Sequence, residues 1–240
     1  MNDHCFSTES NHCAGCHSCT SNHNPQFAGL DNDRRQLIDQ NRNKLKYKKG
    51  EIIYKEGIFP SKLFCLNRGK VMIMKEDDHG NAIITNLFKG VCFLGISEFV
   101  LQRPYETKCI ALEDCEICLI HGKTALDFIS DNKVFAGRIM AELANQFHNA
   151  NALMLTMSKK NMEARLAATL LDLLKLFGKD SNGFLDVYLK RSHLALLSHM
   201  SEANLIRNLS EFQKMGLLGL EQKKIKIQQL EKLERIVNLS

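Results

Sequence analysis

The sequence of 240 residues lacks any long apolar run. No stretch approaches the roughly 18 consecutive apolar residues that a membrane-spanning helix needs. The first residues lack both the basic start and the apolar segment of a secretory signal. Compositional bias is also absent, because 44% of the residues are hydrophobic and 25% are charged, which excludes a disordered or collagen-like chain. No nucleophile–base pair and no phosphate-binding loop can be recognised. We therefore expect a globular cytoplasmic protein that is not an enzyme and does not enter a membrane.

Positive charge is concentrated in the second half of the sequence. The net charge of +5 has no contribution from residues 1–133, which carry 17 basic and 17 acidic side chains. Residues 134–240 carry 15 basic and 10 acidic side chains and supply the whole excess. A neutral half joined to a basic half favours a protein whose second half contacts a polyanion such as a nucleic acid.

Residues 30–132 have the pattern of a β-roll. Short β-type runs lie between glycines at intervals of mostly 7–12 residues, which is the spacing of turns in an all-β sandwich or barrel. The segment from Asp77 to Asn81 predicts a hairpin turn, with Gly80 free to adopt a positive φ. We expect about eight strands, preceded by a short helix over 30–44. The clearest strands are at 51–55, 70–75 and 82–88.

Residues 133–158 are predicted to form a long dimerisation helix. Six apolar residues follow one another at alternating intervals of three and four residues, which is a heptad seam of the kind that joins two parallel helices. A helix that packed only on its own domain would have a wider apolar face, and such a buried helix is the alternative interpretation. The seam residues are Met140, Leu143, Phe147, Ala150, Met154 and Met157.

Residues 159–240 are predicted to form a winged helix-turn-helix. Two helices joined by a three-residue turn at 198–200 match this motif, in which the second helix enters the major groove of DNA. Ser201 is a suitable N-cap for that second helix. The glycine-containing residues 216–219 and the basic run at 223–227 predict the short hairpin called the wing. The expected elements before the wing are helices over 162–177, 192–197 and 201–215 and a strand over 184–189.

Residues 1–29 form a polar, cysteine-rich tail that contains four of the nine cysteines. Cys13, Cys16 and Cys19 are separated by two residues each, so one short loop can place three thiolates around a metal ion or an iron–sulfur cluster. A zinc site completed by His17 or His23 is an alternative, as is thiol-based redox switching. The other five cysteines lie in apolar segments, where cysteine is usually a small buried hydrophobe. They are Cys65, Cys92, Cys109, Cys115 and Cys118.

The order of β-roll, long helix and winged helix-turn-helix resembles the CRP/FNR superfamily of bacterial transcription regulators. The resemblance covers approximately residues 30–230 and is densest at Met157–Ala168 and at Leu209–Leu218. The first of these two segments is similar to the one that leads into the DNA-binding domain in the oxygen-sensing FNR branch. The resemblance implies an α+β fold in which the β-roll is a jelly roll similar to cyclic-nucleotide-binding domains. It also implies a homodimeric regulator that binds a palindromic double-stranded DNA operator, with RNA polymerase as a further partner.

The FNR-like resemblance also implies a cofactor. Sensors of that branch hold a [4Fe–4S] cluster with three cysteines from the N-terminal tail and one from the β-roll. The matching roll residue is Cys115, and Cys5 is the alternate fourth ligand. Ligation by Cys115 would join the tail to the roll, whereas ligation by Cys5 would leave the site within the tail. We therefore expect a redox- or gas-sensing iron–sulfur site at Cys13, Cys16, Cys19 and Cys115.

A regulator without a cluster, responsive to a cyclic nucleotide or to haem, is the alternative function. Cyclic-AMP-binding members place a glutamate directly after the glycine of the phosphate cassette and an Arg-Ser/Thr pair further along. Here Gly95 precedes Ile96 and Ser97, and the later pair is Glu106 and Thr107. A carboxylate repels phosphate, so the sequence disfavours a cyclic nucleotide as the ligand.

The predicted recognition helix departs from the FNR pattern. Arg207 matches the arginine that binds guanine or a phosphate, but the glutamate that would accept from cytosine is one residue early, at Glu202, and Ala203 stands in the aligned place. One residue is about 100° of helix, so Glu202 cannot simply replace it. Asn204 is a candidate for adenine, and we expect an operator that differs from those of well-known relatives. The predicted DNA-contacting residues are Ser201, Glu202, Asn204, Arg207, Lys223 and Lys224.

Overall fold

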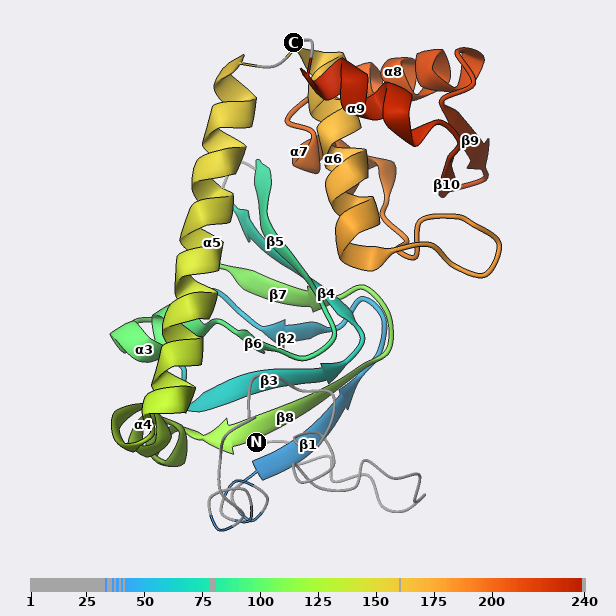
Figure 1. Ribbon diagram of the computed structural model, residues 1–240. Coiled ribbons are helices and arrows are strands. Elements are labelled where there is room, and N and C mark those ends of the chain that lie inside the picture. The colour runs from blue at the N-terminus through green and yellow to red at the C-terminus, as the bar shows by residue number, and fades with distance from the viewer. Residues whose placement is uncertain are drawn as a thin grey trace.

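The computed structural model describes residues 42–77, 81–159 and 161–238, together with positions 33, 36, 38 and 40. A β-roll, a long helix and a compact helical domain follow one another along the chain, and Figure 1 shows the long helix α5 (Lys133–Lys159) running past the roll towards that domain. This arrangement confirms the predicted α+β fold class. Within the described ranges, no helix is both long enough and apolar enough to cross a membrane.

The β-roll consists of two antiparallel sheets. One has the strand order β1-β8-β3-β6, and the other has the order β2-β7-β4-β5. The number of described strands in the roll agrees with the number expected from the glycine spacing. Their bounds are β1 (Arg42–Tyr47), β2 (Ile52–Tyr54), β3 (Lys62–Arg68), β4 (Lys70–Glu76), β5 (Ala82–Lys89), β6 (Cys92–Leu94), β7 (Lys108–Ala111) and β8 (Cys115–His121).

Two elements expected from the sequence are wrong in whole or in part. The helix expected over 30–44 does not reach residue 44, because residues 42–47 form β1, which pairs along its whole length with β8. The strand expected over 184–189 is not formed in this described segment, in which Leu185 makes an isolated bridge to Lys179. Its backbone bonds go to separate places, since the Leu185 N–H donates to Ile225 O (2.8 Å) and the Asp186 N–H to Gly178 O (3.0 Å). No continuous ladder can form from such contacts.

Aromatic packing fixes the start of α5 against the roll. Phe135 contacts Phe93 and Phe128 edge to face, with ring centroids 5.7 and 6.3 Å apart. Ile139, one turn further along, is buried in the same apolar cluster. The base of the long helix is therefore held by the roll. Two shorter helices also contribute to this cluster, α3 (Ile96–Leu101) and α4 (Gly122–Asp131).

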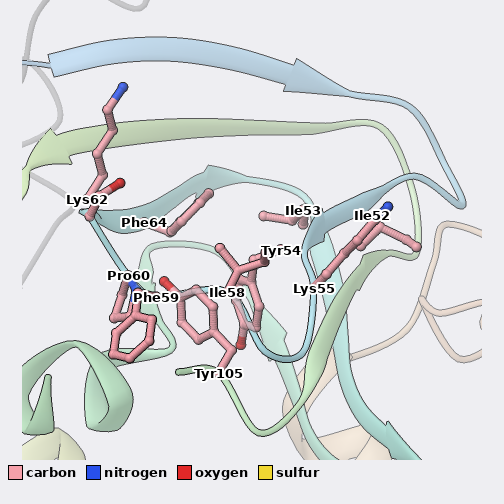
Figure 2. Close-up of a pocket in the computed structure, with 11 residues that line it drawn as sticks. Ile52, Ile53, Tyr54, Lys55, Ile58, Phe59, Pro60, Lys62, Phe64 and Tyr105 are labelled. Carbon is pink, nitrogen blue, oxygen red and sulfur yellow. The ribbon is translucent and has the colours of Figure 1, made fainter. Parts of the chain in front are cut away.

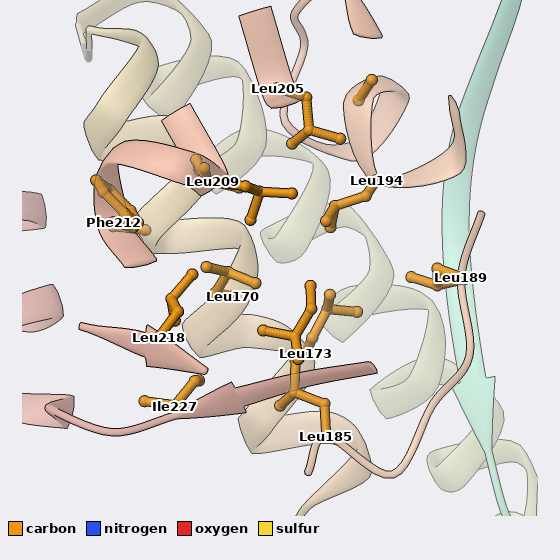
Figure 3. Packing of buried hydrophobic residues seen from close by; sticks show 14 of the residues in the cluster. Leu170, Leu173, Leu185, Leu189, Leu194, Leu205, Leu209, Phe212, Leu218 and Ile227 are labelled. Carbon is orange, nitrogen blue, oxygen red and sulfur yellow. The ribbon is translucent and has the colours of Figure 1, made fainter. Parts of the chain in front are cut away.

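The C-terminal domain encloses its own apolar core, part of which is drawn in Figure 3. Helix α6 (Met162–Phe177) matches the predicted helix because both of its ends are set locally. The Asn161 side chain accepts the Ala164 N–H at 2.9 Å, and Gly178 follows the last turn with a φ of 76°. The last helix, α9, packs on α6 and has no counterpart among the elements expected from the sequence. The remaining elements are α7 (Arg191–Leu197), α8 (Glu202–Lys214), β9 (Leu218–Glu221), β10 (Lys224–Ile227) and α9 (Leu230–Asn238).

The roll and the C-terminal domain share a buried apolar contact. Met72 and Met74 of β4 and Ile84 of β5 belong to the same buried cluster as Leu189 and Leu194 of the C-terminal domain. In Figure 1, β4 and β5 are strands of the roll that extend towards that domain. Burial of apolar surface therefore joins the two domains in this structure.

Replacing Gly69 with alanine is expected to destabilise the protein more than replacing Gly50 does. Both glycines have positive φ (+113° and +89°), so both substitutions strain the backbone, but only a Cβ on Gly69 would meet other atoms, at 2.5 Å from Cys115 Sγ. Overpacking of this kind costs about 1–3 kcal/mol. Urea unfolding of G69A and G50A measures the difference between the two losses. Equal losses of unfolding free energy would contradict the prediction and indicate that the Cys115 side chain moves aside.

Candidate functional site

The helix-turn-helix consists of α7 and α8, joined by residues 198–200. His199 adopts a left-handed conformation in this turn (φ 50°). Ser201 then caps α8 as predicted, because its side chain accepts the Asn204 N–H at 3.2 Å. Burial lowers the pKa of His199, and the nearby Arg165 adds to that effect, so the imidazole is neutral at neutral pH and contributes no charge to this surface.

The two faces of α8 have different environments. Leu205, Leu209 and Phe212 are buried in the core of the domain, which fixes the orientation of the helix. Arg207 Nη2 donates to Asn204 Oδ1 at 3.1 Å, so two of the predicted contact residues form one polar pair. In a helix that enters the major groove, the exposed face is the one that meets the base edges. The exposed residues of the first two turns are Glu202, Ala203, Ile206 and Arg207.

Ile206 is a surface residue that the sequence patterns did not single out. Its side chain is 54% exposed beside Arg207, although a large apolar residue in a helix is usually expected to pack in a core. In the major groove, apolar side chains contact the methyl group of thymine. Helical spacing could have identified this residue, since Ala203 and Ile206 are three residues apart and lie on the same face.

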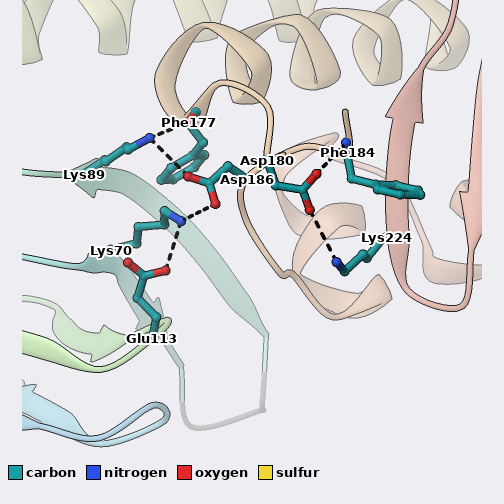
Figure 4. A network of polar contacts seen from close by, with 8 residues as sticks. All are labelled: Lys70, Lys89, Glu113, Phe177, Asp180, Phe184, Asp186 and Lys224. Carbon is teal, nitrogen blue, oxygen red and sulfur yellow. Dashed lines mark hydrogen bonds and ion pairs between the residues drawn. The ribbon is translucent and has the colours of Figure 1, made fainter. Parts of the chain in front are cut away.

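The two wing lysines have different surroundings. Lys224 Nζ lies 3.3 Å from the Asp180 carboxylate and 5.4 Å from the centre of the Phe184 ring, so its charge is directed towards a loop of its own domain. Figure 4 shows this pair near the contacts with the roll. Lys223 lies in the exposed turn between β9 and β10, where its ammonium group is 5.9 Å from the centre of the Tyr188 ring and not paired with a carboxylate in the way that Lys224 is. Lys223 is therefore better disposed than Lys224 to contact a phosphate.

Part of the predicted heptad seam forms an exposed apolar stripe on α5. Of Met140, Phe147 and Met154, Phe147 has the largest exposed fraction, 70%. Leu143 is instead half-buried and packs against the apolar cluster of the roll. The side chain of the last seam residue, Met157, lies outside the described residues. The exposed seam residues are Met140, Phe147, Ala150 and Met154.

Cys115 begins β8 and is 2% exposed. Its thiol donates to the backbone oxygens of Lys70 (3.4 Å) and Glu113 (3.2 Å). Burial raises the pKa of the Cys115 thiol, and the Glu113 and Asp114 carboxylates add to the rise. In this conformation Cys115 is a neutral hydrogen-bond donor. To bind a metal ion as a thiolate, its side chain would have to leave both carbonyl oxygens.

The other described cysteines are buried, as the sequence predicts. Cys118 packs with Cys65 in the cluster beneath α4 and α5, whereas Cys115 packs with Cys92 and Cys109 in a separate cluster. The opposite orientation of Cys115 and Cys118 follows from their odd spacing along β8. Burial raises the pKa of the Cys92 and Cys109 thiols, so the thiolate form that binds a metal ion is disfavoured at both residues.

The predicted tail ligands lie outside the described residues, namely Cys5, Cys13, Cys16 and Cys19. Among the residues that the structure describes, no group of three or more His, Cys, Asp or Glu side chains is arranged to hold a metal ion. Cys115 is the one predicted ligand that lies among the described residues.

A small cavity lies in the roll between the β2–β3 segment and Tyr105, as Figure 2 shows. Its volume is about 290 Å³, near the lower end for small-molecule pockets. The rings of Tyr54 and Tyr105 stack with their centroids 4.0 Å apart. Tyr105 also covers Gly95, since a Cβ on that glycine would collide with the tyrosine ring. The glycine of the predicted phosphate cassette therefore contacts an aromatic ring, and the later pair at 106–107 supplies no cation.

Two protein-family models match the chain. Residues 44–132 match the cyclic nucleotide-binding domain, and residues 164–236 match the Crp-like helix-turn-helix domain. The first range contains most of the β-roll, and the second contains the helix-turn-helix with its wing and α9.

Two curated relatives are similar to this chain over most of its length. Electron transport regulator A of Shewanella oneidensis is 26% identical over 198 residues, which cover 81% of this chain and 78% of that protein. The fumarate and nitrate reduction regulatory protein of Escherichia coli K12 is 23% identical over 214 residues, which cover 88% of this chain and 84% of that protein.

Solved structures share the fold. FixK2 from Bradyrhizobium japonicum superimposes with a TM-score of 0.72 at 19% identity, over 81% of this chain and 96% of that one. The c-di-GMP responsive regulator CLP of Xanthomonas campestris gives a TM-score of 0.71 at 18% identity, over 83% of this chain and 100% of that one. With the two matching domains and the regulator relatives, these findings show that the chain belongs to the CRP/FNR family and is a DNA-binding transcription regulator, not an enzyme.

Proposed function

We propose that this regulator acts as a homodimer that binds a palindromic operator and responds to redox state or to a gas through an iron–sulfur cluster held by its N-terminal cysteines. The observation that carries the sensing part is the position of Cys115. Its thiol is hydrogen-bonded to the backbone of Lys70, and the Lys70 side chain contacts the DNA-binding domain. RNA polymerase is the expected partner at promoters, and the cytoplasm, where bacterial DNA lies, is the expected location.

Operator recognition is assigned to the exposed face of α8. The guanidinium of Arg207 presents parallel donors that suit O6 and N7 of one guanine, and its contact with Asn204 limits its freedom. Ile206 adds an apolar surface suited to thymine, and Glu202 lies on the first turn. In a symmetric dimer the two α8 helices would read half-sites about 34 Å apart, one turn of DNA.

Dimerisation is assigned to the apolar stripe of α5. Exposed large apolar side chains at heptad positions are covered when a second copy of the same helix packs in parallel. Leu143 lies within the seam and also packs on the roll, so the dimer surface is continuous with the sensor domain. A signal that reaches the roll can therefore influence how the two α5 helices meet.

The cluster is assigned to Cys13, Cys16, Cys19 and Cys115. Four thiolates are a usual ligand set for a [4Fe–4S] cluster, which when bound supplies a group that oxidants and gases attack. Cys115 suits the fourth position because it stands at the end of the β1–β8 ladder, next to a turn. Its burial and its acidic neighbours keep it protonated in the metal-free protein, so joining the ligand set changes both its charge and its contacts.

Introducing charge into the α5 stripe is expected to abolish the dimer. The double variant F147E/M154E would place like charges face to face at core heptad positions. The control N145E/N149E adds the same two charges on the opposite side of α5, where both asparagines are exposed. Sedimentation should give the monomer mass for the first variant and the dimer mass for the control. A dimer mass for both variants would identify the stripe as something other than the dimer surface.

Removing the Arg207 side chain is expected to reduce specific binding. R207A should lose roughly 1–3 kcal/mol on an operator selected from random DNA, with little change on non-specific DNA. K223A should weaken binding to all sequences alike and lower the salt slope by about 1. K224A should have a smaller effect, because Lys224 is paired with Asp180. Titrations at several salt concentrations measure all three, and a uniform loss for R207A would reassign Arg207 to a phosphate.

Single Cys→Ser variants are expected to separate the cluster ligands from the other cysteines. After anaerobic reconstitution, C13S, C16S, C19S and C115S should lose the broad visible absorption and most of the iron. C5S should keep both, as should C118S, which alters a buried cysteine on the other face of β8. Iron and zinc analysis with optical spectra provides the measurement. Loss in C5S with retention in C115S would move the site into the tail, and zinc without iron in every preparation would refute the iron–sulfur proposal.

A further inference from the structure

Residues 185–189 of the DNA-binding domain have two different sides. Leu185 and Leu189 are buried in the core of that domain, and backbone bonds hold the Leu185 and Asp186 N–H groups to other parts of the same domain. Asp186 and Tyr188 alternate with these leucines and are only partly buried or exposed. The segment is thus fixed to its own domain while it offers a carboxylate and an aromatic ring on its other side.

Two lysines of the roll bind the carboxylate. Lys70 Nζ lies 2.9 Å from Asp186 Oδ1, and Lys89 Nζ lies 3.3 Å from Asp186 Oδ2. Lys89 also donates to the backbone oxygen of Phe177 at the end of α6. Figure 4 shows both ammonium groups directed at Asp186, which therefore lies at the centre of the polar contact between the domains.

Lys70 is the buried member of this group. Its side chain is 8% exposed, and its ammonium nitrogen lies 2.9 Å from two carboxylates, Glu113 of the roll and Asp186 of the DNA-binding domain. A buried charge requires its partners, because an unpaired one keeps its desolvation cost without compensation. Separating the two domains would remove one of the two counter-charges, so the charge balance of Lys70 depends on how the domains are placed.

The backbone of Lys70 is tied to Cys115. Lys70 O accepts the Leu112 N–H at 2.8 Å and the Cys115 thiol at 3.4 Å. The same thiol donates to Glu113 O, and the Glu113 side chain holds the Lys70 ammonium group. The single S–H proton is shared between these two oxygens, so moving the Cys115 side chain away from them removes the contact that links the two residues that position the buried charge.

A second connection runs through Asp114 and Lys49. Asp114 Oδ1 accepts the Lys49 N–H at 3.1 Å, and the Lys49 ammonium group lies 4.2 Å from the centre of the Tyr188 ring. The turn at 112–115 thus contacts two of the three roll lysines that meet segment 185–189.

We propose that these contacts form a clasp that holds the DNA-binding domain against the β-roll, and that a change at Cys115 loosens the clasp and alters the position of α8. The clasp consists of Lys49, Lys70, Lys89, Asp186 and Tyr188. The idea that metal ligation at Cys115 loosens the clasp rests on the proposed function. The clasp as an interdomain contact, governed by the turn at 112–115, is independent of that function.

Hydrogen exchange of the full-length, metal-free protein tests the clasp. D186N should accelerate exchange of peptides covering 108–115 and 185–189 roughly tenfold, because a charged hydrogen-bonding partner of a buried group is lost. D180N is the matched control, since it neutralises a carboxylate in the preceding loop that pairs with Lys224 within the same domain. It should leave 108–115 at the wild-type rate. Wild-type exchange at 108–115 in D186N would overturn the clasp.

The connection between Cys115 and the clasp is tested with two variants of the same residue, C115A and C115S. C115A removes the hydrogen-bond donor, whereas C115S keeps one at the same position. C115A should therefore accelerate exchange at 185–189, C115S should do so much less, and C118A, a buried change on the other face of β8, should leave that segment unchanged. If C115A and C118A both left 185–189 at the wild-type rate, Cys115 would have no influence on the DNA-binding domain and the coupling would be refuted.

The last measurement separates this inference from the proposed function. The measured quantity is the ratio of operator affinities between the iron-loaded and metal-free forms. It is determined for the wild-type protein and for D186N. Coupling through the clasp predicts that D186N binds iron normally, with an unchanged spectrum, while the ratio falls towards one. If the ratio of operator affinities between the iron-loaded and metal-free forms of D186N equalled the wild-type ratio, transmission through the clasp would be refuted. Absence of iron from the wild-type protein would instead refute the proposed function, and the exchange results would still decide the clasp.

Discussion

The Lys70 ammonium group joins the two domains at one defined place, between a carboxylate of the roll and a carboxylate of the DNA-binding domain. The apolar contact between Met72 and Met74 of the roll and Leu189 of the DNA-binding domain supplies buried area, but hydrophobic burial has no preferred direction. The Lys70 side chain supplies a direction, because it is 8% exposed and its ammonium group lies 2.9 Å from one carboxylate of each domain. In the clasp that we propose, the placement of α6 and α8 relative to the roll depends on that pairing.

The surfaces that we assign to dimerisation and to DNA lie on different parts of the chain. The base of α5 is fixed to the roll by Phe135, and beyond it the helix exposes Phe147 and Met154, the surface that we propose for a second copy. The exposed face of α8, which we propose for DNA, is oriented by the apolar face that the same helix buries in its own domain. Family membership does not determine the ligand, since the stacked Tyr54 and Tyr105 line the cavity of this roll and the Tyr105 ring covers the cassette glycine.

The sequence by itself determined the elements whose signals are local. The limits of α6 could be read because an N-cap at Asn161 and a glycine at 178 act on the adjacent turn only. The Ser201 cap of α8 and the number of strands in the roll were readable for the same reason, as was the burial of the scattered cysteines. The heptad spacing likewise located α5 and the apolar stripe along it.

Tertiary structure alone decided the features that depend on partners distant in sequence. Residues 42–44 became a strand because β8 was available to pair with them, and residues 184–189 did not form the expected strand because their backbone partners lie in separate places. The pairing of Lys224 with Asp180 likewise joins residues 44 positions apart, so it could not be read from a local pattern. A one-dimensional pattern records which side chains could be buried or charged. The free energy that selects among the possible partners arises only when the folded chain brings them together and removes them from water.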